Sequence, residues 1–492
     1  MKNSKLTLYL ILIMVFVWGC DDLFDVTPAT SLPPEDVITS GEGVEALRES
    51  MYSKQRESFA YTTQHFLGSA ALTDLTRNRP GSTRFQALTQ ATDGDGGRSH
   101  ITSWTGTYNI VQDANIMIGA VDDDAIETLD QETLERFRGE AYAIRAFAFH
   151  NLVRVMGYEP GNFDQGPEAN WDRGIVLQTD PVFNLDDVIE APRASVDDVY
   201  AQIRSDLDEA ESRLQGVTDN TRMNEAFVHG VRARVELYAG EWAAARDAAT
   251  DAIAAFPGAL VDTPEGVDGM FVEGAGDHPE ALYKLVVDPN TEPIAGSNVN
   301  DGPAAYTSDQ WGAQLPTNVV LDKYEEGDYR YDGWYEDCFN AQEGEPFANC
   351  DAVNANGWTL TKFNGGKGNL ADDLPYMRLS EMFLIKAEAA AKAGSVADGL
   401  PHLNDLREAR GVGSLDQGDF SNMDDFEDEI LDERVRELVG EGHRFYDLKR
   451  LQRPVLNIDG STKFRADSHR ILGPVPIGEQ DVNAELEENP GY

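Results

Sequence analysis

The sequence predicts a mainly helical protein, in which tetratricopeptide-like helix pairs form a right-handed helical array and a loop-rich ligand-binding region carries minor β structure. Three observations favour this fold class. Apolar residues recur at three- and four-residue spacings in many segments of roughly 15 to 20 residues, as in half-buried helices. Small residues occupy the expected contact faces. Single glycines, Gly240 and Gly394, join close pairs, although the units do not repeat at one fixed period.

The expected helices fall into two blocks, at about 104–256 and 376–451, after one earlier helix. Ser195 is a good capping residue for one of them, since its hydroxyl can accept a backbone N–H. Asp197 and Asp198 in the first turn suit the helix dipole. The expected helices span residues 43–56, 104–121, 131–156, 195–214, 222–239, 242–256, 376–393, 396–410 and 424–451.

An insertion at 257–375 separates the two blocks and is rich in Gly, Asn, Asp, Pro and aromatic residues. A structureless segment of this length is unusual in a compact domain, so we predict a folded and functional excursion. A short strand is expected at 281–287. Residues 74–97, rich in Gly, Asp, Thr, Arg and Pro, form a second candidate binding loop.

Residues 432–451, DERVRELVGEGHRFYDLKRL, have the pattern of a solvated amphipathic helix. Their apolar side chains form one stripe, and charges of alternating sign fill the other face. Gly440 and Gly442 each cost about 1 kcal/mol in a helix interior, so they indicate a break or a close packing contact. The opposite charges that helical spacing brings together are Arg434 with Glu437, Glu441 with Arg444, and Arg444 with Asp447.

The N-terminus has the pattern of a bacterial lipoprotein signal. Two lysines precede an apolar run at 6–18, which is too short for a comfortable membrane span, and Gly-Cys follows. We therefore expect residues 1–19 to be a signal peptide, Cys20 to carry lipid, and 20–40 to be a lipidated tether that holds the protein to a membrane. An ordinary signal peptide or an anchor helix is the alternative.

The charge balance excludes nucleic acid as a partner. The formal net charge is −47, from 87 acidic and 40 basic residues, and the acids are spread along the whole chain. Such a surface cannot replace the counterions of a phosphate backbone. The acidic coat suggests adaptation to high salt, where screening reduces self-repulsion, and it favours neutral over polyanionic ligands.

Two further cysteines, Cys338 and Cys350, lie in a polar, loop-like stretch of the insertion. In an exported protein a disulfide between them is plausible and would contribute about 3 kcal/mol. They lack nearby histidines, so they are poor evidence for zinc. We predict no metal and no cofactor.

No catalytic motif appears in the sequence. A nucleophile elbow, a phosphate loop, an HExxH helix and paired CxxC motifs are all missing. Pairs of carboxylates suited to glycoside hydrolysis are uninformative, because an acidic chain of this size must contain some. We therefore predict a protein that is not an enzyme and has no catalytic residues.

Sugar binding requires flat apolar faces and planar polar groups around them, and the insertion supplies both. The alternative is that most of its aromatic side chains anchor the insertion on the helices. Asp74 and Arg77, from the early loop, are candidates for the same site. The candidate ligand-binding residues are Trp311, Tyr306 and Trp334 for stacking, with Asn300, Asp74 and Arg77 for polar contacts.

Several motifs occur together in one known family. They are Arg434, Glu437-Leu438, Glu441-Gly442, Arg444, Asp447-Leu448 and Arg450, then Trp104, Tyr108, Ile110 and Ala114-Asn115, then Arg138-Gly139-Glu140-Ala141 with Arg145-Ala146, and the ending Asn489-Pro490-Gly491-Tyr492. This set resembles the SusD/RagB family of outer-membrane nutrient-binding lipoproteins, over nearly the whole mature chain. On this resemblance residues 41–492 form a SusD-like domain, and 432–451 is a structural segment that does not touch ligand.

The resemblance implies a non-catalytic protein anchored in the outer membrane by its lipid and facing the cell exterior. It would capture a ligand, typically an oligosaccharide, and deliver it to a SusC-like TonB-dependent transporter. Two rival functions stay open, a peptide- or protein-binding helical scaffold and, less favoured, a secreted glycosidase. The identity of the ligand does not follow from the sequence, because related scaffolds carry different loops.

Overall fold

The computed structural model describes residues 34–56, 66, 68–79, 82–83, 85–92, 104–271, 278–287, 314–337, 358–363 and 372–492. Most of these residues are helical, and the strands among them are short. The longer helices are α3 (Gly41–Gln55), α6 (Trp104–Gly119), α7 (Gln131–Met156), α8 (Val196–Leu214), α9 (Glu225–Ala239), α10 (Trp242–Ala255), α15 (Leu379–Ala393), α16 (Val396–Ala409) and α17 (Met423–Leu438). The shorter elements used below are α2 (Pro34–Thr39), α4 (Ser69–Ala71), η4 (Leu185–Asp187), α14 (Tyr329–Trp334), α18 (Arg444–Arg450) and α19 (Ile477–Gln480).

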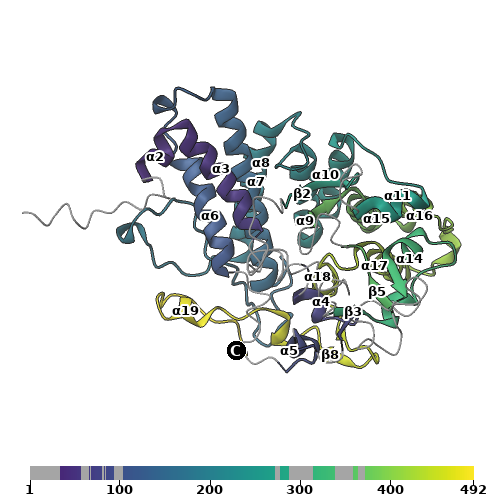
Figure 1. Cartoon of the computed structure of the whole chain (residues 1–492). Helices are drawn as coiled ribbons and strands as arrows, with labels where there is room; N and C mark the ends of the chain where they lie inside the picture. The colour runs from purple at the N-terminus through teal and green to yellow at the C-terminus, as the bar shows by residue number, and fades with distance from the viewer. Residues whose placement is uncertain are drawn as a thin grey trace, which may run out of the picture.

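The long helices pack on one another in chain order and form one extended stack. Helix α6 packs on α7, α7 on α8, α8 on α9 and α9 on α10, while α15 contacts both α10 and α16. Figure 1 shows α2, α3 and α6 at one end of this stack and α15, α16 and α17 at the other. A large apolar core runs through most of the molecule, and a smaller one lies between α15, α16 and α17. The predicted mainly helical array is thus confirmed.

Local signals place several helix ends where the sequence predicts them. Helix α7 has the expected bounds, and α8 begins after Ser195, whose side chain accepts a hydrogen bond from the backbone N–H of Asp198 at 3.1 Å. Helix α9 ends at Gly240, which has a φ of +71°, so a residue with a side chain would be strained there. These ends depend on residues next to them in the chain.

The predicted helix 376–393 begins instead as a strand. Strand β6 (Leu374–Arg378) is fully buried and pairs antiparallel with β2 (Ala281–Leu285), which confirms the strand expected at 281–287. A run of apolar residues does not distinguish a buried strand from the first turn of a helix, so the sequence pattern could not place this boundary. The pairing ties the insertion to the start of α15.

The predicted helix 424–451 is two helices, α17 and α18, and not one. A turn at residues 439–443 separates them, and both of its glycines adopt left-handed backbone, with φ of +79° at Gly440 and +83° at Gly442. The expected break is therefore present. Most of the expected solvated charges are buried instead: the charged residues 433, 434, 436 and 437 in the last turns of α17 are buried and ion-paired, while the exposed acids of α17 lie near its start.

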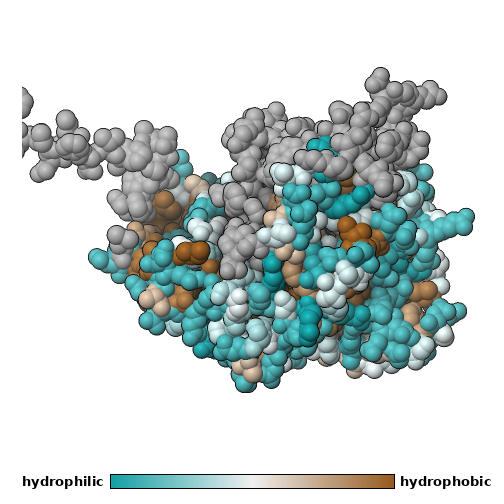
Figure 2. Space-filling view, turned by 90° about the horizontal axis from the view of Figure 1, so that it is seen from below, coloured by the Kyte–Doolittle hydropathy of each residue, from teal (hydrophilic) through white to brown (hydrophobic). Residues whose placement is uncertain are grey.

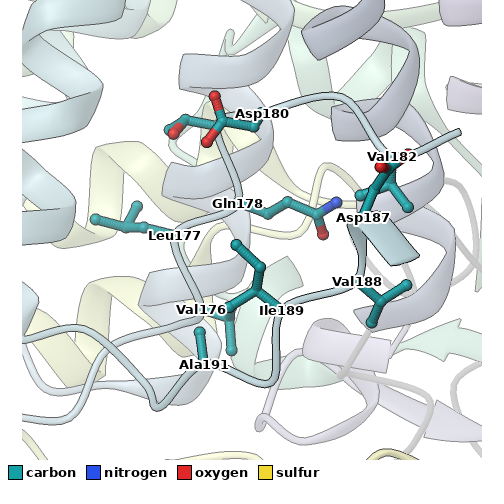
Figure 3. A pocket seen from close by; sticks show the side chains of 10 residues that line it. Val176, Leu177, Gln178, Asp180, Val182, Asp187, Val188, Ile189 and Ala191 are labelled. Atoms are coloured by element: carbon teal, nitrogen blue, oxygen red, sulfur yellow. The ribbon is translucent and has the colours of Figure 1, made fainter. Parts of the chain in front are cut away.

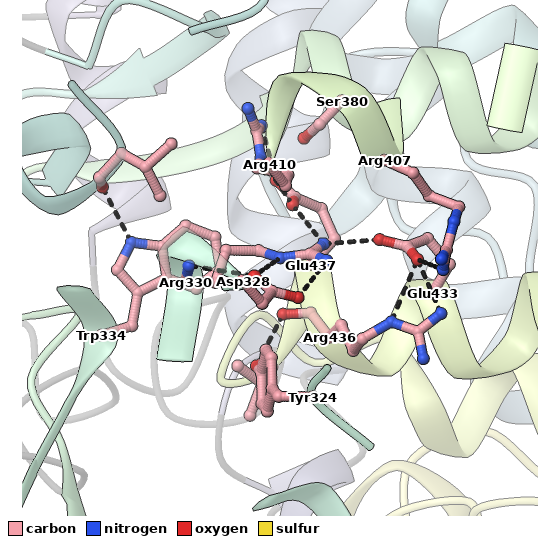
Figure 4. A network of polar contacts seen from close by, with 12 residues as sticks. Tyr324, Asp328, Arg330, Trp334, Ser380, Arg407, Arg410, Glu433, Arg436 and Glu437 are labelled. Atoms are coloured by element: carbon pink, nitrogen blue, oxygen red, sulfur yellow. Dashed lines mark hydrogen bonds and ion pairs between the residues drawn. The ribbon is translucent and has the colours of Figure 1, made fainter. Parts of the chain in front are cut away.

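Glu437 lies at the centre of this buried ionic network (Figure 4). Its side chain is 0% exposed, and its two carboxylate oxygens accept hydrogen bonds from Arg330 at 3.0 Å, Arg378 at 2.7 Å and Arg410 at 3.0 Å. Burial alone raises the pKa of Glu437, but the charges of Arg410 and Arg378 outweigh burial and hold that pKa well below its usual value. The network ties α17 to the insertion and to the end of α16.

Four antiparallel two-stranded ladders occur in the described part of the chain. Besides β2 with β6, they pair β1 (Thr76–Asn78) with β3 (Gln314–Pro316), β4 (Tyr335–Asp337) with β5 (Trp358–Leu360), and β7 (Val455–Leu456) with β8 (Thr462–Phe464). Among the described residues, no helix has the length and apolar content to cross a membrane.

Candidate ligand-binding site

The ladder of β1 with β3 brings together the two regions that the sequence nominates for binding. Arg77 pairs with Leu315, so the early loop lies against the insertion. The hydroxyl of Thr317 donates a hydrogen bond to the backbone carbonyl of Asp74 at 2.6 Å and closes the end of the ladder. Strand β3 begins three residues after Trp311. Asp74 and Arg77 therefore lie next to the segment that leads to the predicted stacking residue.

Asp74 places a buried carboxyl group at this site. Asp74 as a whole residue is 4% exposed. One of its carboxylate oxygens lies 3.5 Å from Nη2 of Arg444, the first residue of α18. Within the described residues, the other oxygen, Oδ1, has no hydrogen-bond partner, and the same holds for Nε of Arg444. A buried carboxylate and a guanidinium with spare hydrogen-bonding capacity are suited to hold a polar ligand.

Polar side chains continue along the ladder. Arg77 and Asn78 of β1 are half-buried, and Gln314 opposite Asn78 is buried. Burial lowers the pKa of Arg77, although this group remains a cation at any physiological pH. The guanidinium of Arg77 and the amide of Asn78 are planar groups of the kind that bind the paired hydroxyls of a sugar, whereas Gln314 is fully buried in the ladder.

Trp334, a predicted stacking residue, lies in the core. Its side chain is 1% exposed, its indole N–H donates to the backbone carbonyl of Val267 at 2.9 Å, and its ring meets that of Phe271 edge to face at 5.5 Å. The ammonium of Lys362 lies 4.2 Å from the ring centroid. In this structure Trp334 therefore anchors the insertion and offers no open face to a ligand.

The neighbouring aromatic residues form a cluster of their own. Tyr324 contacts Tyr331 at 5.8 Å and Tyr335 at 5.4 Å between ring centroids, and Tyr331 contacts Trp358 at 5.3 Å. The hydroxyl of Tyr324 donates to the backbone carbonyl of Arg436 in α17 (Figure 4). The contacts of these described rings agree with the alternative interpretation, in which the aromatic side chains of the insertion anchor it on the helices.

The remaining candidates lie outside the described residues. They are Trp311, Tyr306 and Asn300 for ligand binding, Cys20 for lipidation, and Cys338 with Cys350 for the disulfide.

A second hollow was not predicted from the sequence. It lies between α6, the connector 176–191 and the C-terminal tail, and consists of two adjoining cavities of about 320 Å³ and about 420 Å³. Figure 3 shows Gln178 and Ile189 pointing into the space between two arms of the connector. The connector carries three adjacent apolar pairs, Val176-Leu177, Val182-Phe183 and Val188-Ile189, between acidic and amide residues, and this pattern is the signal in the sequence that could have indicated the hollow.

Comparisons of the sequence with protein families and with known proteins all point to the same family. A family model described as the SusD family matches residues 297–492, and one described as "starch-binding associating with outer membrane" matches residues 22–237. A SusD-like protein of Formosa agariphila is 24% identical over 545 residues, covering 100% of this chain and 99% of its own.

Solved structures share the fold. A SusD superfamily protein from Bacteroides thetaiotaomicron superposes with a TM-score of 0.77 at 23% identity, over 91% of this chain and 99% of its own. A surface glycan-binding protein A from Bacteroides fluxus superposes with a TM-score of 0.70 at 20% identity, over 92% of this chain and 99% of its own.

The stacked helices and the ladder-supported loops define a helical-array protein with a polar site carried on loops. The two family models together cover most of the chain, and the fold agrees with them. The chain belongs to the SusD family, which confirms the prediction from its motifs.

Proposed function

We propose that the protein is a non-catalytic, lipid-anchored protein of the outer cell surface, which captures an oligosaccharide and delivers it to a SusC-like TonB-dependent transporter. Membership of the SusD family supports this, as do the match to a family described as starch-binding and associated with the outer membrane and the similarity in fold to a surface glycan-binding protein. The observation that carries the proposal is the β1–β3 ladder, which sets Asp74 and Arg77 beside the segment leading to Trp311.

The proposed ligand is a neutral glycan. Trp311 and Tyr306 would stack on the apolar faces of sugar rings, while Asp74, Arg77 and Asn300 would bind hydroxyls. The carboxylate of Asp74 accepts hydrogen bonds and the guanidinium of Arg77 donates two in a fixed geometry. The acidic surface disfavours polyanionic sugars.

Isothermal titration against a panel of neutral oligosaccharides tests the site. Trp311→Ala and Arg77→Ala should each weaken binding of the best ligand by about tenfold or more, because each removes a central contact. Arg246→Ala, at a partly exposed arginine of α10, is the matched control and should bind as the wild type does. Unchanged affinity in both site variants would show that the ligand binds elsewhere.

The same sugars test the absence of catalysis. Incubation of the protein with each bound oligosaccharide should release no shorter product, measured by chromatography over a day. Product release would overturn the non-catalytic function and favour a glycosidase. Binding of peptides but of no sugar in the titrations would favour the helical scaffold instead.

Lipid anchoring is tested at Cys20. Cells grown with labelled palmitate should incorporate the label into the wild-type protein and not into Cys20→Ser, and only the wild type should sediment with outer membranes. A protease added to intact cells should degrade the wild type if it faces the exterior. Label in both proteins, or in neither, would contradict the proposed anchor.

A further inference from the structure

Exposed apolar side chains gather in two segments of the described chain. Among all the described residues, six large hydrophobic side chains are exposed, and five of these six fall within residues 183–189 and 477–482. Ile189 is 79% exposed and Val482 is 68% exposed. In Figure 2 one of the brown areas lies toward the end of the molecule where Figure 1 places α19. The members of the set are Phe183, Val188, Ile189, Ile477 and Val482, and the sixth side chain is Ile458.

The two segments meet at the second hollow and form one surface. The cavity of about 420 Å³ is lined by Val188 and Ile189 from the connector and by Val482 from the tail, with Trp104 and Tyr108 of α6 also lining it. The rings of Trp104 and Tyr108 lie 5.1 Å apart. We call this surface the tail groove. It combines a concave apolar lining with protruding aliphatic side chains at its rim.

The tail groove is held in place by hydrogen bonds to the connector backbone. The hydroxyl of Tyr108 donates to the carbonyl of Val176 at 2.7 Å, and the amide of Asn483 donates to the carbonyl of Ala191 at 2.9 Å. Gln112 accepts from the N–H of Val182 at 3.0 Å. The exposed side chains therefore stand on a backbone that is fixed at both ends, and a preorganised apolar surface in water is typical of an interaction site.

Negative charge surrounds the tail groove. Asp180, Asp187, Glu190 and Glu479 line its two cavities, and among the described lining residues there is no lysine, arginine or histidine. An anionic lipid surface would be repelled by this rim, and so would a second copy of the chain, which carries the same carboxylates. A protein with apolar side chains surrounded by lysine or arginine fits in both shape and charge.

We propose that the tail groove is the docking surface for a basic-rimmed apolar segment on the extracellular side of the SusC-like transporter. This rests on the proposed function, which supplies the partner. The described chain begins at α2, at the same end of the molecule as α19 (Figure 1). Cys20 lies 14 positions before Pro34, so a lipid at Cys20 holds this end within ~50 Å of the membrane in which the transporter sits.

Single charge insertions test the docking surface. Ile189→Asp and Val482→Asp alter side chains that are already in water, so folding should be retained, whereas in a complex each would bury a carboxylate among apolar groups. Ile458→Asp is the matched control, as an exposed isoleucine outside the groove. The probe is a SusC-like transporter of the same organism, purified in detergent, with affinity measured by biolayer interferometry and glycan affinity by titration.

We expect Ile189→Asp and Val482→Asp to bind the transporter about tenfold or more weakly, Ile458→Asp to bind normally, and all three to retain glycan affinity. Raising the salt concentration should weaken the wild-type complex, because the rim charges are screened. Equal transporter affinity in all variants would overturn the docking surface and leave the proposed function intact.

Two other results would also overturn it. A wild-type protein that binds glycan but no transporter would remove the delivery part of the proposed function, and the docking surface with it. A wild-type dimer in sedimentation velocity that Ile189→Asp abolishes would assign the tail groove to a second copy of the chain.

Discussion

At the residue scale, the buried charges of α17 show how strongly partners can shift ionisation. Glu433 accepts hydrogen bonds from Arg330 at 2.6 Å and from Arg436 at 2.7 Å, and its side chain is fully buried. Burial alone raises the pKa of Glu433, but the charges of Arg330 and Arg436 outweigh it and lower that pKa to about 2. The folded protein thus favours the ionised form of this carboxyl far more than the unfolded chain does.

A loss of stability in acid follows for Glu433. A folded-state pKa below the unfolded value stabilises the protein at pH values above the unfolded value, and this contribution disappears as the pH falls from about 4.5 to about 2. The shift corresponds to about 3 kcal/mol of unfolding free energy. Urea unfolding at a series of pH values should show this decline in the wild type.

The matched variant is Glu433→Gln, which keeps the shape of the side chain and removes the titrating group. It should be less stable at neutral pH, with a flatter dependence of unfolding free energy on pH below about 4.5. Equal slopes in the two proteins would mean that Glu433 does not contribute to the acid sensitivity.

Arg444 shows that charge spacing along a chain does not determine charge pairing. Helical spacing predicts that it meets Glu441 or Asp447, yet its guanidinium lies 3.5 Å from Asp74 at the candidate site. Asp447 pairs with Arg434 at 2.8 Å instead. The expectation that 432–451 is structural fits its buried pairs, while Arg444 connects the segment to a residue proposed to bind ligand.

At the element scale, the turn between α17 and α18 decides which partners the charges find. Gly440 and Gly442 reverse the chain through left-handed backbone, so α18 packs beside α17 and does not continue it. Arg434 of α17 can then reach Asp447 of α18, 13 positions further along the chain. Two glycines that weaken a helix are therefore what permits the ionic network of this segment.

Gly440→Ala should destabilise the protein by about 1–2 kcal/mol, because a side chain at a φ of +79° meets the following carbonyl oxygen. Thermal or urea unfolding measures this change. Gly413→Ala is the control, since a Cβ at Gly413 would meet open space and its φ is not in the left-handed region. If the two variants lose the same stability, the backbone conformation of Gly440 is not the cause.

At the scale of the whole molecule, the internal and external charges behave differently. Inside, acids and bases are paired at contact distance, as around Glu437, and salt screens such pairs little. Outside, the net charge of −47 leaves a surface that repels itself. The stability of the fold should therefore depend on ionic strength through its surface and not through its core.

The unfolding free energy should rise as NaCl increases from about 0.1 M to about 1 M, since the screening length falls from about 10 Å to about 3 Å. Denaturation by urea, which is uncharged, measures this without adding ions. Sucrose at matched osmolarity is the control, because it has no charge to screen the surface. A protein equally stable at both salt concentrations would contradict surface repulsion as a destabilising force.

Much of the helical framework could be predicted because its signals are local. The periodicity of residues 131–156 and the capping side chain of Ser195 lie within the elements that they define. The same holds for the family motifs. The strand at 374–378 could not be predicted, since it is a strand only because β2, about 90 residues earlier in the chain, pairs with it.

The candidate site was predicted only in part for the same reason. The composition of a loop indicates Asp74 and Arg77 as candidates, but their position beside the insertion depends on pairing with β3, more than 200 residues away. The burial of Trp334 depends on Phe271 and Lys362, which no spacing around Trp334 indicates. The tail groove needs a connector and a tail that are about 300 positions apart.

The sequence by itself determined that this protein is a helical array of the SusD family, with an acidic surface and a chemistry suited to binding, because periodicity, caps, motifs and net charge are properties of short segments or of composition. Only the tertiary structure decided which charges are buried, which aromatic side chains support the fold, and which loops meet at a site. The physical reason is that burial and pairing arise between residues far apart in the chain, where a carboxylate such as Glu437 meets three arginines from other segments.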